Sequence, residues 1–82
     1  MGLGIMYFVY ILKLTDGRFY KGQTMDLEKR LKRHESGEVE STRNHLPYKL
    51  IHAEICDTRL EARKLEKYFK SGYGREIIKE FV

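Results

Sequence analysis

The sequence predicts a single small α+β domain, a three-stranded antiparallel sheet flanked by helices. Three observations carry this prediction: two apolar or aromatic segments joined by a Thr-Asp-Gly turn, a third alternating segment that follows the one proline, and two amphipathic segments that each begin at a capping residue. With 82 residues the chain can build one modest core. We expect residues 1–5 to form a loose N-terminal tail and residues 6–82 to form the domain.

The three expected strands differ in pattern. Residues 6–14 are almost continuously apolar, which is typical of a strand covered on both faces. Residues 15–18 form a turn, and residues 19–23 form a short return strand. Pro47 opens the third strand, over residues 48–56, where apolar and polar side chains alternate. The expected chain order is therefore strand, strand, helix, strand, helix.

The turn of the hairpin decides whether two tyrosines can share a site. In a two-residue Asp-Gly loop, Tyr20 faces Lys13, and Tyr10 lies on the opposite face of the sheet. If Gly17 instead takes the left-handed position after a type I turn, Tyr20 faces Leu12, and Tyr10 is its diagonal neighbour on the same face. Both loops suit Asp-Gly, and local preference favours the shorter one. We predict the three-residue loop, because a shared site requires it.

Two helices have clear starting signals. Asp26 is a favourable N-cap for a helix that runs to about Ser36 and ends at Gly37. The spacing places three residues on one stripe of this helix, with Arg30 beside it: Leu27, Leu31 and His34.

A capping box of Thr58 and Glu61 starts the other helix, which runs to about Lys70. We expect the two glycines that follow, at positions 72 and 74, to break it. A last short helix is then predicted over residues 76–82.

Composition limits the class of protein. The chain is 41% hydrophobic and 34% charged, as an ordinary globular protein is, and has no apolar run of the roughly 20 residues that a membrane span needs. Cys56 is the one cysteine, so no intrachain disulfide and no cysteine-based metal site can form. We expect a cytoplasmic protein with no membrane association.

Positive charge gathers in the last third of the chain. The formal net charge is +4, and residues 59–79 alone carry seven Lys or Arg against three Glu. A basic surface of this kind favours contact with nucleic acid. The alternative is a solvated helix face, which a charge run taken alone favours.

Several side chains suit phosphodiester chemistry. Tyr10 and Tyr20 supply phenols, which most often serve packing in strands but can act near a cation. Gly22 ends a short strand, a place where a backbone or ligand often comes close. Arg30 is either a solvated helix residue or a guanidinium that grips phosphate oxygens, and His34, one turn later, has a pKa suited to proton transfer.

Glu66 is the most specific single candidate. It borders the apolar stripe of the second helix, so its carboxylate needs a partner. That partner is either a lysine, Lys67 or Lys70, or a divalent metal held by one carboxylate, waters and substrate phosphate.

The motifs Val9-Tyr10-Ile11 and Tyr20-Lys21-Gly22, with the residues that follow, resemble the GIY-YIG endonuclease family, from about Tyr7 to about Arg75. The compact length and Thr42-Arg43 look most like its small stand-alone bacterial members. The pattern departs from the family at Phe8 and Lys21, and Ile78 stands near the place of a frequent asparagine. The resemblance implies five catalytic residues: Tyr10, Tyr20, Arg30, His34 and Glu66.

The resemblance further implies hydrolysis of DNA phosphodiester bonds with one Mg²⁺ or Mn²⁺ ion held by Glu66. Without a second domain that reads sequence, we expect a preference for DNA structures or ends, through phosphate contacts. A homodimer or a partner protein that supplies specificity is left open. The alternative function is a weakly active or inactive nucleic-acid-binding module acting with a partner; a protein-interaction domain is a third. Seven residues are expected to bind substrate: Lys21, Gly22, Gln23, Arg43, Arg63, Lys67 and Lys70.

Overall fold

The computed structural model describes residues 5–82, so the expected loose tail lies, for residues 1–4, outside the described part. The helices and strands are β1 (Tyr7–Lys13), β2 (Phe19–Thr24), α1 (Leu27–Glu35), β3 (Lys49–Cys56), α2 (Arg59–Phe69) and α3 (Gly72–Ile78), with short 3₁₀ turns at Arg43–His45 and Lys79–Phe81.

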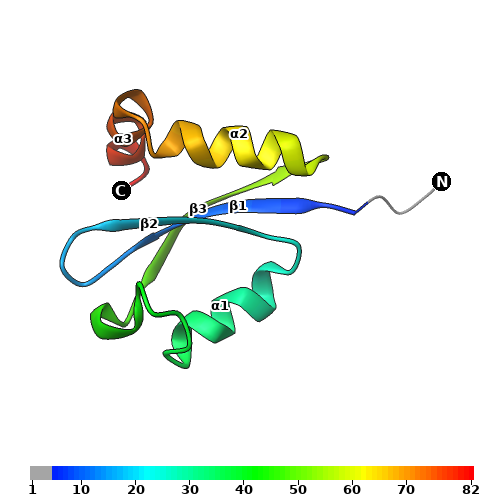
Figure 1. Cartoon of the computed structure of the whole chain (residues 1–82). Coiled ribbons are helices and arrows are strands. Elements are labelled where there is room, and N and C mark those ends of the chain that lie inside the picture. Colours follow the sequence, from blue (N-terminus) through cyan, green and yellow to red (C-terminus); the bar gives the residue numbers. More distant parts are fainter. Residues whose placement is uncertain (1–4) are drawn as a thin grey trace.

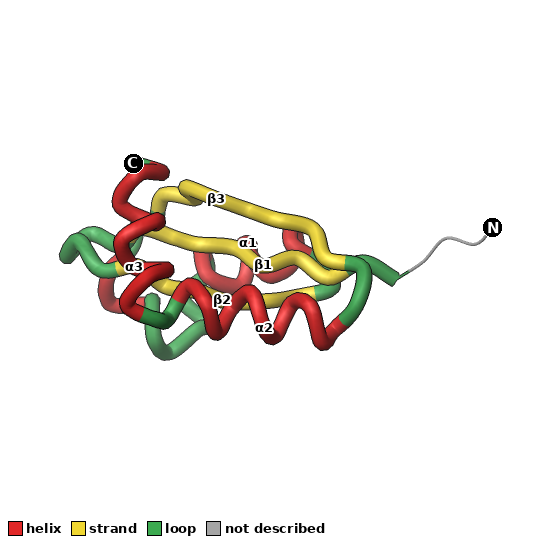
Figure 2. The backbone as a smooth tube through the Cα atoms, turned by 90° about the horizontal axis from the view of Figure 1, so that it is seen from above, coloured by secondary structure: helices red, strands yellow, loops and turns green. Residues whose placement is uncertain are grey.

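The strands form one antiparallel sheet, as the sequence predicts, and their order in the sheet is β2-β1-β3. Helix α1 covers one face, and α2 and α3 cover the other (Figures 1 and 2). The apolar strand β1 is the central one, and its residues 9–12 are all fully buried. Within residues 5–82 no helix combines the length and apolar character needed to cross a bilayer.

The hairpin has the predicted three-residue loop. The amide of Leu14 donates to the carbonyl of Arg18 at 2.9 Å, and the amide of Gly17 donates to the carbonyl of Leu14 at 3.0 Å. Gly17 has a φ of +88°, the left-handed conformation that glycine adopts without strain. Tyr20 therefore pairs with Leu12 and lies on the same face of the sheet as Tyr10.

Both predicted capping residues act at their helix starts. The Asp26 carboxylate accepts from the amide of Lys29 at 3.0 Å, and the Thr58 hydroxyl accepts from the amide of Glu61 at 3.0 Å. Gly37, with a φ of +80°, follows the end of α1. These caps fix where α1 and α2 begin, and with them the positions of Arg30 and Glu66.

Helix α2 ends at Phe69, close to the predicted Lys70, but the glycines at positions 72 and 74 do not make the break, because both lie inside the next helix, α3. The Ser71 hydroxyl accepts from the amide of Gly74 at 3.2 Å and caps this helix. A Cβ atom at position 74 would overlap the backbone carbonyl of Tyr68. Gly74 thus allows α3 to pack closely against the end of α2, and the helix starts earlier than residue 76.

Each face of the sheet has its own buried cluster. The face under α2 and α3 carries six buried residues, all apolar or cysteine: Val9, Ile11, Cys56, Ala62, Phe69 and Ile78. The face over α1 carries three buried residues with four partly buried ones packed against them: Tyr10, Leu12 and Leu14, then Tyr20, Leu27, Leu31 and Tyr48. The candidate catalytic tyrosines thus belong to the α1 face.

Candidate active site

Four of the predicted site residues meet on the α1 face. The Arg30 guanidinium donates from Nε to the Tyr10 hydroxyl at 3.1 Å and from Nη2 to the Tyr20 hydroxyl at 3.3 Å. The Tyr10 hydroxyl also lies 2.9 Å from Nε2 of His34. Strand β1, strand β2 and helix α1 each contribute to this group, so the predicted convergence of these four side chains is confirmed.

Gly22 leaves room for the two phenols. It pairs with Tyr10 across the hairpin, and a Cβ atom there would lie 2.6 Å from the Tyr10 hydroxyl and 2.9 Å from a ring carbon of Tyr20. Any larger residue would push the phenols away from Arg30. The close approach expected at this glycine is therefore made by the Tyr10 side chain.

A buried hydrogen-bonded chain runs from Tyr10 through His34 to Thr42. Nδ1 of His34 lies 2.8 Å from the Thr42 hydroxyl, which donates to the carbonyl of Val39 at 3.5 Å. The hydroxyl therefore accepts from Nδ1–H of His34, and Nε2 of His34 accepts from the Tyr10 hydroxyl. Both His34 and Thr42 are fully buried, and each has its partners.

Thr42 is a site residue that the sequence analysis does not assign. It lies in a polar, irregular segment with no periodicity to mark an inward-facing position. The one signal available was its place in the Thr42-Arg43 pair that resembles the small stand-alone family members.

Burial sets the charges of this group. Desolvation lowers the pKa of His34 to about 4, with the nearby charges of Arg30 and Arg33 adding to the effect. Desolvation also raises the pKa of Tyr10 to about 12, although the hydrogen bond from Arg30 opposes the rise. The same hydrogen bond raises the pKa of Arg30. At neutral pH, His34 and Tyr10 are uncharged, and Arg30 carries the positive charge.

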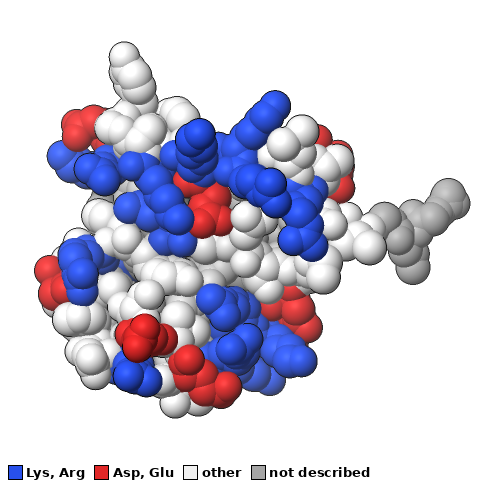
Figure 3. Space-filling model, viewed as in Figure 1, with Lys and Arg blue, Asp and Glu red and all other residues white. Residues whose placement is uncertain are grey.

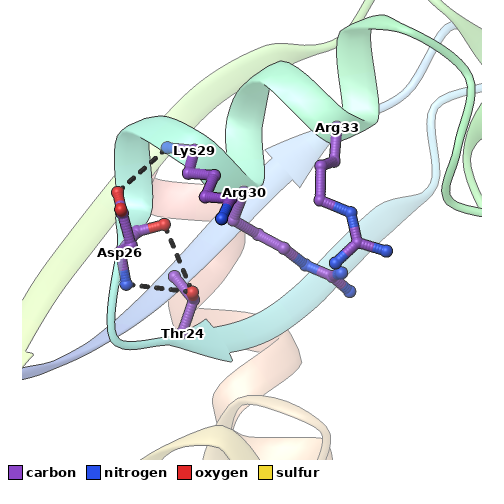
Figure 4. A pocket seen from close by; sticks show the side chains of 5 residues that line it. All are labelled: Thr24, Asp26, Lys29, Arg30 and Arg33. Atoms are coloured by element: carbon purple, nitrogen blue, oxygen red, sulfur yellow. Dashed lines mark hydrogen bonds between the residues drawn. The ribbon is translucent and has the colours of Figure 1, made fainter.

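An open pocket of about 200 Å³ lies on the outer side of Arg30 (Figure 4). Five residues line it: Thr24, Asp26, Lys29, Arg30 and Arg33. Lys29 and Arg33 were not among the predicted site residues. Arg33 lies one turn after Arg30, and that spacing was the available signal.

Glu66 does not join the other four residues. It lies on α2, which packs on the opposite face of the sheet, so the predicted convergence of five side chains on one face is wrong. Burial of the α2 stripe against Val9 and Ile11 fixes this placement. The Glu66 carboxylate accepts from Nζ of Lys70 at 2.8 Å, as the lysine alternative predicted, and its side chain is 18% exposed.

A second open pocket, of about 230 Å³, lies beside Glu66. Its lining consists of Glu66 and four of the predicted substrate-binding residues: Gln23, Arg63, Lys67 and Lys70. Gln23 and Thr24 are successive residues of β2, and each lines a different pocket. Because successive strand residues point to opposite faces, the two pockets lie on either side of this edge strand.

The surface charge follows the same arrangement. Figure 3 shows one group of Lys and Arg side chains over α2 and α3 and another over α1, with an uncharged band where β2 runs between them. The two pockets and the two basic groups thus flank the same edge strand, β2.

The remaining predicted residues lie apart from the pockets. Lys21 is on the α2 side of β2, where burial and the charges of Arg75 and Lys70 lower its pKa. Arg43 is exposed on a 3₁₀ turn and lines neither pocket. Ile78, near the place of the frequent asparagine, is fully buried in the α2-side core.

The pocket beside Glu66 offers one carboxylate and one side-chain amide to a hydrated metal ion. Among residues 5–82 no group of three or more His, Cys, Asp or Glu side chains is placed to hold a metal. Mg²⁺, however, keeps several waters and commonly binds through one or two carboxylates plus phosphate oxygens. Lys70 contacts only Oε2 of Glu66, and the amide of Gln23 lines the same pocket. Oε1 of Glu66 and the amide oxygen of Gln23 are the donors that such an ion could use. Arg63, Lys67 and Lys70, which line the same pocket, repel a bare cation and favour its phosphate ligand.

Tyr10, Tyr20, Arg30 and His34 form one hydrogen-bonded group, here called the Tyr10–Arg30 group. Comparison with known protein families identifies the class of protein to which this fold and this group belong. A model of the GIY-YIG catalytic domain matches residues 6–79, and the chain belongs to the GIY-YIG family. Membership of this family indicates a nuclease, an enzyme that hydrolyses phosphodiester bonds.

Individual relatives are small proteins of one kind. A UPF0213 protein of Bacillus licheniformis is 45% identical over 65 residues, covering 78% of this chain and 67% of that protein. A UPF0213 protein of Haloquadratum walsbyi is 41% identical over 71 residues, covering 85% and 79%. The solution NMR structure of a UPF0213 protein from Bacillus halodurans superposes with a TM-score of 0.59 at 32% identity, covering 92% of this chain and 83% of that one.

Proposed function

We propose that this chain is a divalent-metal-dependent DNA endonuclease with little sequence specificity and a preference for DNA structures or ends. Arg30 is the observation that carries the proposal. Its guanidinium is fixed by two phenols, borders an open pocket, and has no carboxylate within ion-pair distance among residues 5–82. An arginine held in this way is ready to bind a phosphate.

Arg30 and Tyr20 are the groups that contact substrate in this proposal. The guanidinium neutralises the charge that builds on the phosphate oxygens, and the partly buried Tyr20 hydroxyl orients the attacking water. The water oxygen forms a bond to phosphorus and releases a proton to solvent, while one phosphorus–oxygen ester bond breaks and its leaving oxygen takes up a proton from solvent. The products are one strand end with a phosphate and one with a hydroxyl.

Tyr10 and His34 act through Arg30. Both are fully buried, so neither reaches a ligand in the pocket. The Tyr10 hydroxyl accepts from Nε of Arg30 while donating to His34, which holds the guanidinium in one orientation. Their role in the proposal is to position Arg30 before substrate arrives.

Glu66 and Gln23 would hold one Mg²⁺ or Mn²⁺ ion beside the edge of β2. When bound there, the ion supplies positive charge to a phosphate and lowers the pKa of its own waters. The ion pair with Lys70 opens in this state, which is a small cost for a pair in which Lys70 is half-exposed.

Phosphate contacts supply the DNA affinity in this proposal. Five further residues lie on β2 or line the Glu66 pocket: Lys21, Gly22, Arg63, Lys67 and Lys70. Affinity should fall steeply as salt rises and vary little with sequence. A homodimer or a partner protein would supply target choice. A cytoplasmic location would give the protein access to DNA.

The second candidate function is a binding module that cleaves weakly or not at all. The observation that favours it is the Lys70 ammonium, which occupies the Glu66 carboxylate at 2.8 Å. In this case Glu66 forms an ion pair with Lys70 and binds no metal.

Substitution of Glu66 separates the two functions. Glu66→Gln keeps the size of the side chain but removes the charge that a metal needs. Cleavage of duplex, flap, nicked and single-stranded DNA is measured with Mg²⁺ or Mn²⁺ and with chelator. We expect metal-dependent cutting by the wild type, at least about a hundredfold loss in Glu66→Gln, and unchanged DNA binding.

The matched control is Glu76→Gln, which breaks an ion pair of similar length (2.9 Å) between Glu76 of α3 and Lys79 of the turn that follows, although Glu76 is more exposed than Glu66. It should cut at the wild-type rate. Cutting by Glu66→Gln at the rate of this control, with metal limiting, would contradict the metal assignment.

A further inference from the structure

The pocket beside Arg30 is more basic than a single catalytic arginine requires. Lys29, Arg30 and Arg33 bring three positive charges to it, against one carboxylate, that of Asp26. One oxygen of that carboxylate caps α1 by accepting from the backbone amide of Lys29 at 3.0 Å. The excess positive charge faces an open space of about 200 Å³.

Within the protein, Arg33 forms a long ion pair that is exposed to solvent. Its nearest carboxylate is Glu38, with Nε and Oε1 3.8 Å apart and both side chains about half-exposed. The other oxygen of Glu38 already accepts from the Ser36 hydroxyl at 2.6 Å. An exposed pair of this length contributes little, so the Arg33 guanidinium is free to turn to a ligand.

Arg30 and Arg33 both line this pocket. Figure 4 shows both side chains reaching from α1 toward the same side. None of the carboxylates of residues 5–82 bridges the two groups. Like charges brought together without a bridging acid favour an anion, and the planar guanidinium matches two oxygens of a phosphate.

We propose that this pocket binds a second backbone phosphate of the nucleic acid, with Arg33 and Lys29 as its ligands. The proposal rests on the nuclease function above and adds a subsite to it. Arg30 borders both the phenols and this pocket, whereas the Glu66 pocket lies across β2. The strand therefore crosses the edge of β2 and continues along α1, so Arg33 holds a phosphate on the α1 side of the cleaved bond.

The test compares Arg33→Gln with Lys32→Gln. Both remove one positive charge from the last turn of α1, but Lys32 does not line the pocket. Binding of a short DNA duplex is measured with chelator present, so that cleavage plays no part, at several salt concentrations. Thermal unfolding of both variants checks that each is folded.

For Arg33→Gln we expect a several-fold weaker affinity and a salt slope reduced by about 0.9, the value for one lost phosphate contact. Lys32→Gln should change both quantities clearly less. Equal effects of the two substitutions would overturn the subsite and leave the nuclease proposal standing. If Arg33→Gln alone weakens binding but the wild type cuts no DNA with either metal, the subsite holds and the nuclease proposal fails. If the wild type binds no DNA at low salt, the subsite is overturned.

Discussion

The two faces of the sheet bury different kinds of side chain, although both are built on strand β1. Val9 and Ile11 point to the α2 face, where the buried residues are all apolar or cysteine. Tyr10 and Leu12 point to the α1 face, where a fully buried histidine and threonine continue a hydrogen-bonded chain. Alternation along one strand thus separates an apolar core from a polar site.

The comparison indicates a division of tasks. The α2 face supplies burial of apolar surface, the main favourable term in folding. The α1 face also buries polar groups. Burying a polar group destabilises the fold unless the group has a hydrogen-bond partner, and each one here has such a partner. The result is a guanidinium, that of Arg30, held in place at the edge of a small domain.

The largest loss of stability should come from truncating a side chain of the apolar core on the α2 face. Phe69, 2% exposed, packs edge-on against His52 and Phe81. Phe69→Ala should lower the free energy of unfolding by about 3–5 kcal/mol, the usual cost of emptying such a site. Tyr68→Ala, at a neighbouring exposed position, should cost less than half as much. Urea unfolding gives both values, and equal losses would show that the α2 face is not the main source of stability.

The polar face should make stability depend on pH. The pKa of His34 is about 4 when folded and 6.5 in the unfolded chain, so between these values the unfolded state binds the proton and the folded state does not. Stability should therefore fall by about 3 kcal/mol as pH drops from 6.5 to 4. Urea unfolding at several pH values measures this slope. His34→Gln should flatten it; an unchanged slope in that variant would assign the effect to other groups.

Removing the Thr42 hydroxyl from the hydrogen-bonded series Tyr10–His34–Thr42 should lower the free energy of unfolding by a smaller amount. Thr42→Val keeps the shape but leaves Nδ1–H of His34 buried without an acceptor, at a cost of about 1–3 kcal/mol. Thr42→Ser keeps the hydroxyl and loses one methyl group, at a cost of about 0.8 kcal/mol. Thermal or urea unfolding compares them. A valine variant as stable as the serine variant would mean that the chain does not act as a unit.

The starts of α1 and α2 were predictable because the capping residues Asp26 and Thr58 act within their own turns. The hairpin register was not fixed locally, because Asp-Gly suits both loops; the three-residue loop, with Gly17 in the left-handed region, was predicted because a shared site requires it. The register in turn brought Tyr10 and Tyr20 to one face, where Arg30 bonds to both.

The incorrect or missing predictions concern residues whose positions depend on packing between separate elements. Gly74 was expected to break a helix, but it allows α3 to approach the end of α2. Glu66 was expected on the tyrosine face, but the apolar stripe of α2 packs on the other one. Thr42 was not assigned, because nothing in its own segment indicates that it meets His34.

The most direct test of the central claim, that the Tyr10–Arg30 group is a phosphodiester-cleaving centre, is DNA cleavage by Tyr20→Phe. The substitution removes one hydroxyl, whose contact is Nη2 of Arg30 at 3.3 Å, and keeps the ring that packs beside His34. We predict unchanged thermal stability and DNA binding, with cleavage reduced at least about a hundredfold. Cutting at the wild-type rate by this variant would contradict the claim.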